Sequence, residues 1–286
     1  MKKSRLLHVV ATRMFTTLAA DHTIEWLERR LDIFETFTLP SLTSQSCQDF
    51  TWILLVSADL PLVIFSKLKT MVKPYANIYI LAVRVADLHD QAEYQEVFSD
   101  FIQQHKFKYD FLLSSRIDGD DAWHKDYVAK IQQEALAWSA KYTKWSNSAG
   151  VIFNFPYGQI CYPFEIRGKE GIGNWRRKFF SQSVDVLSVK KLHETLYKFP
   201  HSKTAQFAKA NNYLCHYIKT KHPMWLYVQH VQNDGLLRKW HRWFILFEKF
   251  MLKFHHFKAG ELEMYGISEQ SRQRFKQRYL AHTRKC

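Results

Sequence analysis

Short apolar runs alternate with helix-like stretches through the first half of this chain, and this alternation constrains the fold more than any other feature. Four runs have the length and apolar content of buried strands: Leu6–Ala11, Phe50–Val56, Asn77–Val83 and Asp110–Ser114. Between or after them, apolar residues recur at helical spacing over Ile24–Phe37, Leu62–Val72, Glu93–Gln104 and His124–Trp138. This alternation predicts βαβ units around a parallel sheet, with Pro40 at or just past the end of the first helix.

The pattern changes after about Ala149, where we predict a boundary between two halves of the chain. Val151–Phe155 and Gln159–Pro163 are predicted to form a hairpin around the turn-like tripeptide between them. The basic, glycine-rich stretch 167–177 is predicted to be a loop. Two later segments are typical of strands: Ser181–Val189 and Trp225–Val231.

Three carboxylates stand within four positions directly after the fourth predicted strand, in the segment Ser115-Arg116-Ile117-Asp118-Gly119-Asp120-Asp121. Carboxylates this close repel one another unless a cation lies between them. Magnesium-type ions prefer oxygen ligands and are commonly shared between carboxylates and a substrate diphosphate, so the segment indicates a phosphorylated substrate. The alternative is a turn in which Asp120 or Asp121 caps a helix that starts near Ala122.

Polar residues follow three of the predicted strands, and they should meet because ligands bind beyond the carboxyl ends of strands in open sheets. These residues are Thr12-Arg13, Ser57-Ala58-Asp59 and the acidic segment. The guanidinium groups of Arg13 and Arg116 match phosphate oxygens, although Arg116 could instead pair with a neighbouring aspartate. Arg176 and Arg177 are candidates for a diphosphate contact or for an ordinary solvated loop.

The charge balance favours polyanionic partners. The 286 residues carry a formal net charge of +14, and 47% of them are hydrophobic, enough for a large core. The four cysteines show neither CxxC pairing nor zinc spacing, which is typical of free thiols in a reducing compartment. Leu6–Ala11 is too short for an export signal, and no apolar run reaches the length of a membrane span. We therefore expect a cytoplasmic protein that can lie on the inner face of the cell membrane.

The segment Leu236–Lys258 is predicted to form a basic amphipathic helix within a C-terminal extension, residues 236–286. Its apolar residues share one helical face: Leu236, Trp240, Trp243, Phe244, Phe247, Phe250, Met251 and Phe254. Basic residues occupy much of the remaining surface: Arg238, Lys239, Arg242, Lys249 and Lys253. This pattern is typical of a helix that lies on anionic lipid, with an ordinary core helix as the alternative.

Taken together, these motifs resemble the nucleotide-diphospho-sugar glycosyltransferases of the GT-A type. The passage from Ser41–Ser46 into Asp49–Val56 is similar to their second helix-to-strand passage, and Asp118-Gly119-Asp120 is similar to their metal-binding Asp-x-Asp. More narrowly, the chain resembles a bacterial family of rhamnosyltransferases in several further segments: Thr12-Arg13, Arg30-Leu31, Phe34–Phe37, Leu39–Leu42, and His230 with Asn233. Ser57-Ala58-Asp59 departs from the acidic pair that the wider class has at that place.

The resemblance implies a Rossmann-like mixed sheet flanked by helices, with residues 1–149 binding the nucleotide sugar and residues 150–235 facing the acceptor. It implies Mn²⁺ or Mg²⁺ on a set of four residues: Asp118, Asp120, Asp121 and His230. Asp120 is expected to ligate directly, whereas Asp121 could instead cap a helix and His230 could be a structural histidine. The expected donor-binding set is Thr12, Arg13, Asp59, Arg116 and Asp118.

The function that the resemblance implies is transfer of a sugar, with rhamnose suggested by the family, from a nucleoside diphosphate to a surface, envelope or lipid-linked glycan. An inverting enzyme needs a general base near the acceptor hydroxyl; Asp185 and Glu165 are candidates, although spacing supports neither. The alternative, from a different class, is a basic nucleic-acid-binding protein without catalysis, which a steep salt dependence of binding would reveal.

Overall fold

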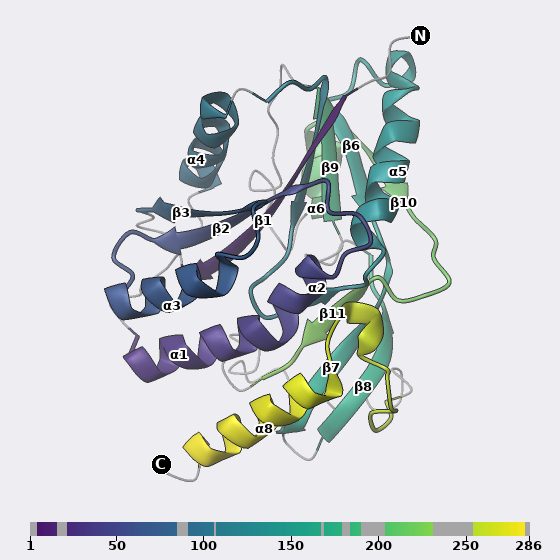
Figure 1. The fold of residues 1–286 in the computed structure, drawn as a ribbon. Helices are drawn as coiled ribbons and strands as arrows, with labels where there is room; N and C mark the ends of the chain where they lie inside the picture. The colour runs from purple at the N-terminus through teal and green to yellow at the C-terminus, as the bar shows by residue number, and fades with distance from the viewer. Residues whose placement is uncertain are drawn as a thin grey trace.

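The structure is a computed structural model that describes residues 5–15, 22–84, 91–105, 107–166, 169–178, 184–189, 204–230 and 254–283. Within these ranges the strands form a larger and a smaller sheet, and helices pack against both (Figure 1). No helix in the described ranges is long and apolar enough to cross a membrane.

The larger sheet has the strand order β10-β6-β9-β4-β1-β2-β3. Its strands are β1 (Leu6–Phe15), β2 (Thr51–Ser57), β3 (Ile78–Val83), β4 (Phe111–Arg116), β6 (Gly150–Asn154), β9 (Val184–Val189) and β10 (Tyr213–Tyr217). β1 is parallel to β2 and β4, and β2 is parallel to β3, which confirms the parallel sheet predicted for the first half. Because β9 is antiparallel to both β4 and β6, the sheet as a whole is mixed. The boundary at residue 149 stays a prediction, and this sheet takes strands from both sides of it.

Helices cover both faces of the larger sheet. Those on one face are α1 (Ile24–Ile33), α3 (Leu62–Val72) and α5 (Tyr127–Ser139), while α4 (Gln91–Gln104) packs on the other. Alternate residues of β2 divide between the two cores: Trp52 and Leu54 lie in the first, and Ile53 and Leu55 lie in the core beneath α4. This explains why β2 is a continuous apolar run, since a strand covered on both faces needs apolar side chains on both.

The first helix does not end at Pro40, contrary to the prediction. α1 continues through a π-helical turn (Phe34–Thr38) into α2 (Leu39–Thr43), with Pro40 in the first turn of α2. The backbone N–H of Leu39 bonds to the carbonyl of Phe34, which is a π-type step. Proline has no N–H and is tolerated in the first turn of a helix, so the change of pitch carries the chain past Pro40 without a break.

The smaller sheet has the order β5-β11-β7-β8. Its strands are β5 (Ala122–Trp123), β7 (Tyr157–Ile166), β8 (Lys169–Arg176) and β11 (Trp225–Val228). The predicted hairpin is wrong, because its first strand is β6 of the larger sheet whereas its second is β7, which pairs with β8 and β11. The loop predicted for 167–177 is also wrong, because residues 169–176 form β8.

Two glycines explain why the turn and loop signals misled. A Cβ at Gly158 would lie 2.0 Å from the ring of Trp225, so this glycine makes room for an indole rather than for a hairpin turn. A Cβ at Gly171 would lie 2.1 Å from the carbonyl oxygen of His255. Ile172, the next residue of β8, exchanges two backbone hydrogen bonds with His255, of 2.9 and 3.0 Å. Both glycines therefore mark close approaches of other parts of the chain to the smaller sheet.

The remaining described helices are α6 (Thr204–Ala210), the 3₁₀ turns η3 (Tyr142–Lys144) and η7 (Glu263–Tyr265), and α8 (Glu269–Thr283). The strands predicted at Ser181–Val189 and Trp225–Val231 correspond to β9 and β11, with residues 181–183 and 231 outside the described ranges. Most of the predicted amphipathic helix, residues 236–253, also lies outside them, and its last residues, 254–258, are not helical: His255 forms a β-bridge with Ile172.

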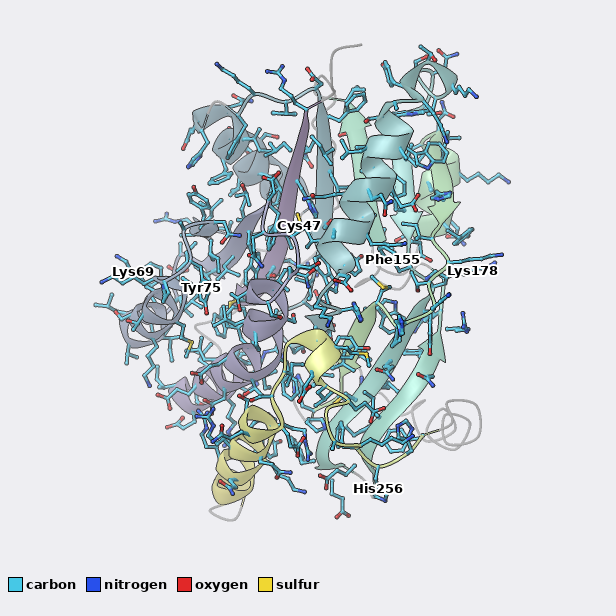
Figure 2. The ribbon with its side chains drawn as sticks, turned by 45° about the vertical axis from the view of Figure 1, so that its right-hand side comes forward. Cys47, Lys69, Tyr75, Phe155, Lys178 and His256 are labelled. Carbon is cyan, nitrogen blue, oxygen red and sulfur yellow. The ribbon has the colours of Figure 1, made fainter. Side chains whose placement is uncertain are left out.

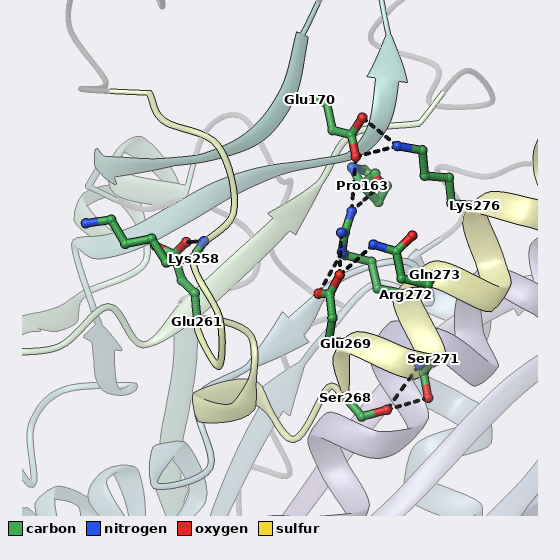
Figure 3. Close-up of polar contacts among 10 residues, drawn as sticks. All are labelled: Pro163, Glu170, Lys258, Glu261, Ser268, Glu269, Ser271, Arg272, Gln273 and Lys276. Carbon is green, nitrogen blue, oxygen red and sulfur yellow. Dashed lines mark hydrogen bonds and ion pairs between the residues drawn. The ribbon is translucent and has the colours of Figure 1, made fainter.

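A cluster of ion pairs joins α8 to the smaller sheet (Figure 3). Arg272 is 4% exposed, and its Nη1 donates to the carbonyl of Pro163 at 3.0 Å and to Glu170 at 3.2 Å. Lys276 Nζ lies 2.7 Å from each carboxylate oxygen of Glu170. Glu269, on the same helix, accepts from Arg272 Nε at 3.0 Å. Glu170 therefore receives two cations from α8 and fixes the helix on β8.

Replacing Glu170 by glutamine is expected to lower the free energy of unfolding by about 1–3 kcal/mol, because it removes the charge that Arg272 and Lys276 share. Urea denaturation of the two proteins measures the difference. The matched control is Glu263→Gln, at an exposed glutamate of η7. Equal losses in both variants would show that this cluster adds nothing specific to stability.

Candidate active site

The acidic segment lies along the end of β1, as expected from the carboxyl ends of parallel strands. Ala11 of β1 is in register with Arg116 of β4, and the N–H of Ile117 donates to the carbonyl of Ala11 at 3.0 Å. A Cβ at Gly119 would lie 3.6 Å from Thr12 Cγ2 and 3.7 Å from the carbonyl oxygen of Arg13. Thr12 and Arg13, predicted to follow the first strand, lie within β1, and the acidic segment after β4 runs beside them.

Asp120 is the centre of this site. Its Oδ2 lies 3.0 Å from Arg30 Nη1 of α1 and 2.9 Å from His230 Nε2, two residues past the end of β11. His230 is fully buried and Asp120 is 7% exposed. Burial alone would raise the pKa of Asp120, but the charge of Arg30 and the hydrogen bond from His230 outweigh it and hold the pKa well below its usual range. Asp120 is therefore a carboxylate at neutral pH.

The geometry also constrains the ring of His230. Its Nε2 lies 3.3 Å from Arg30 Nη1, which can only donate, and 2.9 Å from the carboxylate oxygen of Asp120, which can only accept. One ring nitrogen cannot accept from the first and donate to the second at once. A proton on Nε2 satisfies the shorter contact, so His230 donates to Asp120.

Asp118 lies among positive charges. Burial raises the pKa of its carboxyl, the guanidinium groups of Arg13 and Arg116 oppose that rise, and the neighbouring Asp120 reinforces it. Arg13 is half-buried and Arg116 is 4% exposed. The charges of two arginines, Arg13 of β1 and Arg116 of β4, thus act on one aspartate, and their guanidinium groups suit a phosphate as well as a carboxylate.

Asp121 does not cap a helix, which corrects one of the two alternatives for the acidic segment. α5 begins only at Tyr127, with Asp126 in the N-cap position. Asp121 is fully buried, and its Oδ1 accepts from the backbone N–H of Val228 at 2.9 Å. Its carbonyl accepts from the hydroxyl of Thr38 at 2.8 Å. Asp121 thereby fastens the acidic segment to β11, which brings His230 to Asp120.

Other predicted site residues lie in different settings. Thr12 is fully buried, and its hydroxyl accepts a hydrogen bond from Trp52 Nε1 at 3.0 Å. The hydroxyl therefore lies in the core and is not exposed to a donor. Asp59 is exposed in the turn that follows β2. Glu165 is exposed near the end of β7. Asn233 lies outside the described residues.

Asp185 is at the centre of a buried polar chain under α5. It is fully buried, accepts from the Ser115 hydroxyl, and accepts from the Tyr127 hydroxyl at 2.9 Å. His8 Nε2 lies 2.8 Å from the Ser115 oxygen, and Gln132 donates to His8 Nδ1 at 3.2 Å. Burial raises the pKa of Asp185 to about 7 and lowers the pKa of His8 to about 3. A carboxyl so enclosed has no exposed surface to offer an acceptor.

Arg30 is the functional residue that residue-by-residue reasoning missed. It stands 90 positions before Asp120, on a helix, and nothing in its local sequence distinguishes it from Arg29. The one sequence feature that could have identified Arg30 is the Arg30-Leu31 segment, which is part of the resemblance to the rhamnosyltransferase family. Tyr227 was also missed: it is half-buried on β11, and burial followed by the charges of Asp121 and Asp120 raises the pKa of its phenol.

The predicted metal set is only partly assembled. In the ranges that the structure describes, no three or more histidine, cysteine or acidic side chains form a group that could hold a metal ion. Asp120 Oδ2 and His230 Nε2, however, are 2.9 Å apart and both of a type that divalent manganese accepts. They fit as two neighbouring protein donors once the His230 Nε2 proton is released, and Asp121 Oδ1 instead accepts from the backbone N–H of Val228.

A family model described as "Putative rhamnosyl transferase" matches residues 9–239, and the chain belongs to this family of glycosyltransferases. The mixed sheet flanked by helices, with an acidic segment directly after β4, agrees with the fold that the GT-A resemblance predicted. No curated protein matches the chain.

Several solved structures are similar at low identity. TarS 1–349 from S. aureus in complex with UDP-GlcNAc has 9% identity and a TM-score of 0.44, over 81% of this chain and 61% of that one. The mannosyltransferase PcManGT from Pyrobaculum calidifontis, in complex with GDP-Man and Mn²⁺, has 12% identity and a TM-score of 0.38, over 85% and 60%. A protein from Desulfovibrio desulfuricans G20 described as a "putative nucleotide-diphospho-sugar transferase" has 11% identity and a TM-score of 0.38, over 84% and 90%. The chain thus spans less than two thirds of the TarS and PcManGT chains.

Proposed function

We propose that this protein transfers a sugar from a nucleoside diphosphate to a glycan acceptor, at the site built around Asp120. The observation that supports this most is the convergence of Asp120, which follows β4, and His230, which follows β11 and is 110 positions away, with donor atoms 2.9 Å apart. Membership of the family supports the reaction class.

The arginines at the site suit the diphosphate. The charges of Arg13 and Arg116 act on Asp118, and both guanidinium groups offer forked N–H donors that match phosphate oxygens. Arg30 keeps Asp120 ionised and adds a positive charge where negative charge develops on the leaving group. Asp120 and His230 would hold Mn²⁺ or Mg²⁺, with Asp118 as a further ligand through water or as a ribose contact. When bound, such an ion supplies Lewis-acid stabilisation of the leaving diphosphate.

The finer assignments belong to the same proposal. The family description favours rhamnose as the sugar, and a surface, envelope or lipid-linked glycan as the acceptor fits a cytoplasmic enzyme that works at the inner face of the membrane. The structure supports neither predicted base. Asp185 is fully buried in the core, and Glu165 is next to the last residue of β7. The base therefore stays unassigned within the proposal.

Calorimetric titration with UDP, dTDP and GDP, each with manganese and with a chelator, tests the proposal. We expect one nucleotide to bind in the presence of manganese and to lose most of its affinity with the chelator. No binding of any of the three to the folded protein would refute the donor assignment and would favour the nucleic-acid-binding alternative.

Replacing His230 by alanine is expected to weaken manganese-dependent nucleotide binding by about 10- to 100-fold, because it removes one of two adjacent donors. The same titration measures this affinity. His256→Ala, at the exposed histidine labelled in Figure 2, is the matched control and should bind like the parent. Binding that is unchanged in both variants would make His230 a structural histidine, held by Asp120 alone.

A further inference from the structure

A row of aromatic rings with cations above them lies beside the site, and only Arg177, a sequence candidate for a diphosphate contact, has been linked to the donor. We call this row the aromatic–basic surface and define it by five residues: Trp175, Arg177, Lys178, Tyr217 and Tyr227. Arg177 Cζ lies 5.4 Å from the centre of a Trp175 ring, and Lys178 Nζ lies 5.0 Å from the centre of the Tyr217 ring. Both cations are exposed, and Tyr217 is 39% exposed.

This surface is continuous with the acidic site. The Trp175 ring lies 6.1 Å from the ring of Tyr227. Tyr227 directly precedes Val228, whose N–H donates to Asp121 at 2.9 Å, and it stands three residues before His230. The charges of Asp121 and Asp120 reach the Tyr227 phenol and, together with burial, raise its pKa. A molecule lying on these rings would therefore have one end beside the carboxylates of the donor site.

The rings are held by the core beneath them. Trp175 packs edge-on against Trp225 with ring centres 5.9 Å apart. Trp225 is fully buried, and its Nε1 donates to the carbonyl of Phe155 at 2.8 Å. Gly158 admits this indole because any Cβ there would lie 2.0 Å from it. The platform under Arg177 is thus fixed before any ligand arrives, which lowers the entropic cost of binding.

The segments that carry this surface are basic, whereas the carboxylates of Asp120 and Asp121 lie beyond Tyr227 at its edge. The described stretches 171–178 and 204–230 contain no aspartate or glutamate, and their basic residues are Arg176, Arg177, Lys178, Lys209, Lys219 and Lys221. Figure 2 places Lys178 on the opposite side of the molecule from Lys69 of α3. A ligand on the aromatic–basic surface would gain most from negative charge.

We propose that the aromatic–basic surface binds the acceptor, and that the acceptor is a saccharide that carries phosphate or carboxylate groups. This inference rests on the proposed transferase function and deepens it by naming the class of acceptor. Aromatic faces such as Trp175 and Tyr227 supply flat apolar area for a sugar ring, and Arg177 supplies a fork that matches a phosphate or a carboxylate. The cation over the ring stays partly desolvated and well oriented for such an anion.

Calorimetric titration with defined oligosaccharides tests this proposal. The probes are oligogalacturonate for carboxylates, a phosphorylated mannan oligomer for phosphates, maltoheptaose as the neutral saccharide, and a single-stranded oligothymidylate. We expect at least one anionic saccharide to bind ten times more tightly than maltoheptaose, and the better of the two anionic probes identifies the charged group.

Two variants and one control locate the binding. Arg177→Gln and Trp175→Ala should each weaken the anionic saccharide by about 10-fold or more, as expected for a lost charged hydrogen bond or a lost stacking face. Lys69→Gln makes the same change of charge on the far side and should have no such effect. Arg177 is exposed, so its variant keeps the proposal testable if Trp175→Ala fails to fold.

Three outcomes would overturn the inference: equal binding of the neutral saccharide, equal weakening by Lys69→Gln, or oligothymidylate that binds as tightly with the same dependence on Arg177. The last would assign the surface to nucleic acid. The nucleotide titration is run on the same samples. If no nucleotide binds, the transferase proposal is refuted. If a nucleotide binds but no saccharide does, only the proposed acceptor surface is refuted.

Discussion

Replacing Asp120 by alanine is expected to lower sugar transfer by at least about 100-fold, the loss that corresponds to a few kcal/mol of transition-state stabilisation. Asp120 is the point at which Arg30 and His230 meet, and without its carboxylate neither the proposed ion nor the guanidinium has an anchor. Release of nucleotide from a nucleotide sugar, with and without acceptor, measures the effect. Manganese-dependent nucleotide affinity should fall in parallel.

The fold must be shown to survive, because Asp120→Ala leaves His230 fully buried beside Arg30 without their shared carboxylate. Asp120→Asn keeps an oxygen acceptor at that position and should fold more readily while losing the charge. Asp100→Ala changes an exposed aspartate on α4 and serves as the control. Transfer at the parent rate by the folded Asp120→Asn protein would place the reaction elsewhere.

The fold of the first half could be predicted because its signals are local. β1, β2 and β4 are largely buried, the half-buried β3 is also apolar, and the helices between them repeat their apolar residues at helical spacing. The second half failed where a local signal had a distant cause. Gly158 and Gly171 look like turn glycines, but they exist because Trp225 and His255 approach the sheet from far along the chain. Pro40 looked like a helix stop until a π-helical turn accommodated it.

The site shows the same limit. The acidic segment was found because its three carboxylates are adjacent in sequence and follow a buried strand. His230 came from a family pattern, and it stands 110 positions from the Asp120 that it contacts. Arg30 stands 90 positions away on the other side. Contacts between residues so far apart leave no periodic pattern in the sequence. Only the structure shows that Arg30 and His230 both contact Asp120.

The second large effect concerns the buried chain of Asp185 and His8, whose pKa values shift in opposite directions. Because folding raises the pKa of Asp185 from 3.8 to about 7, the folded state binds that proton more tightly, and stability is lost as pH rises through this window. Because folding lowers the pKa of His8 from 6.5 to about 3, stability is gained as pH rises through that window. In the parent protein the two dependences largely cancel between about pH 4 and 6.5, since a protonated Asp185 and a neutral His8 have the same total charge as the unfolded pair.

Replacing Asp185 by asparagine removes one side of this balance. The stability of Asp185→Asn relative to the parent is expected to rise by about 3 kcal/mol between pH 5 and pH 8, because only the parent must ionise a buried carboxyl over that range. Any hydrogen bond to Ser115 or Tyr127 that the variant loses costs the same at both pH values. That cost therefore does not contribute to the change between pH 5 and pH 8. Urea denaturation at the two pH values measures it, and Asp126→Asn, at an exposed aspartate before α5, should show no comparable change. A pH-independent difference for Asp185→Asn would mean that Asp185 is already ionised in the folded protein at pH 5, and would return it to the list of carboxylates available as a base.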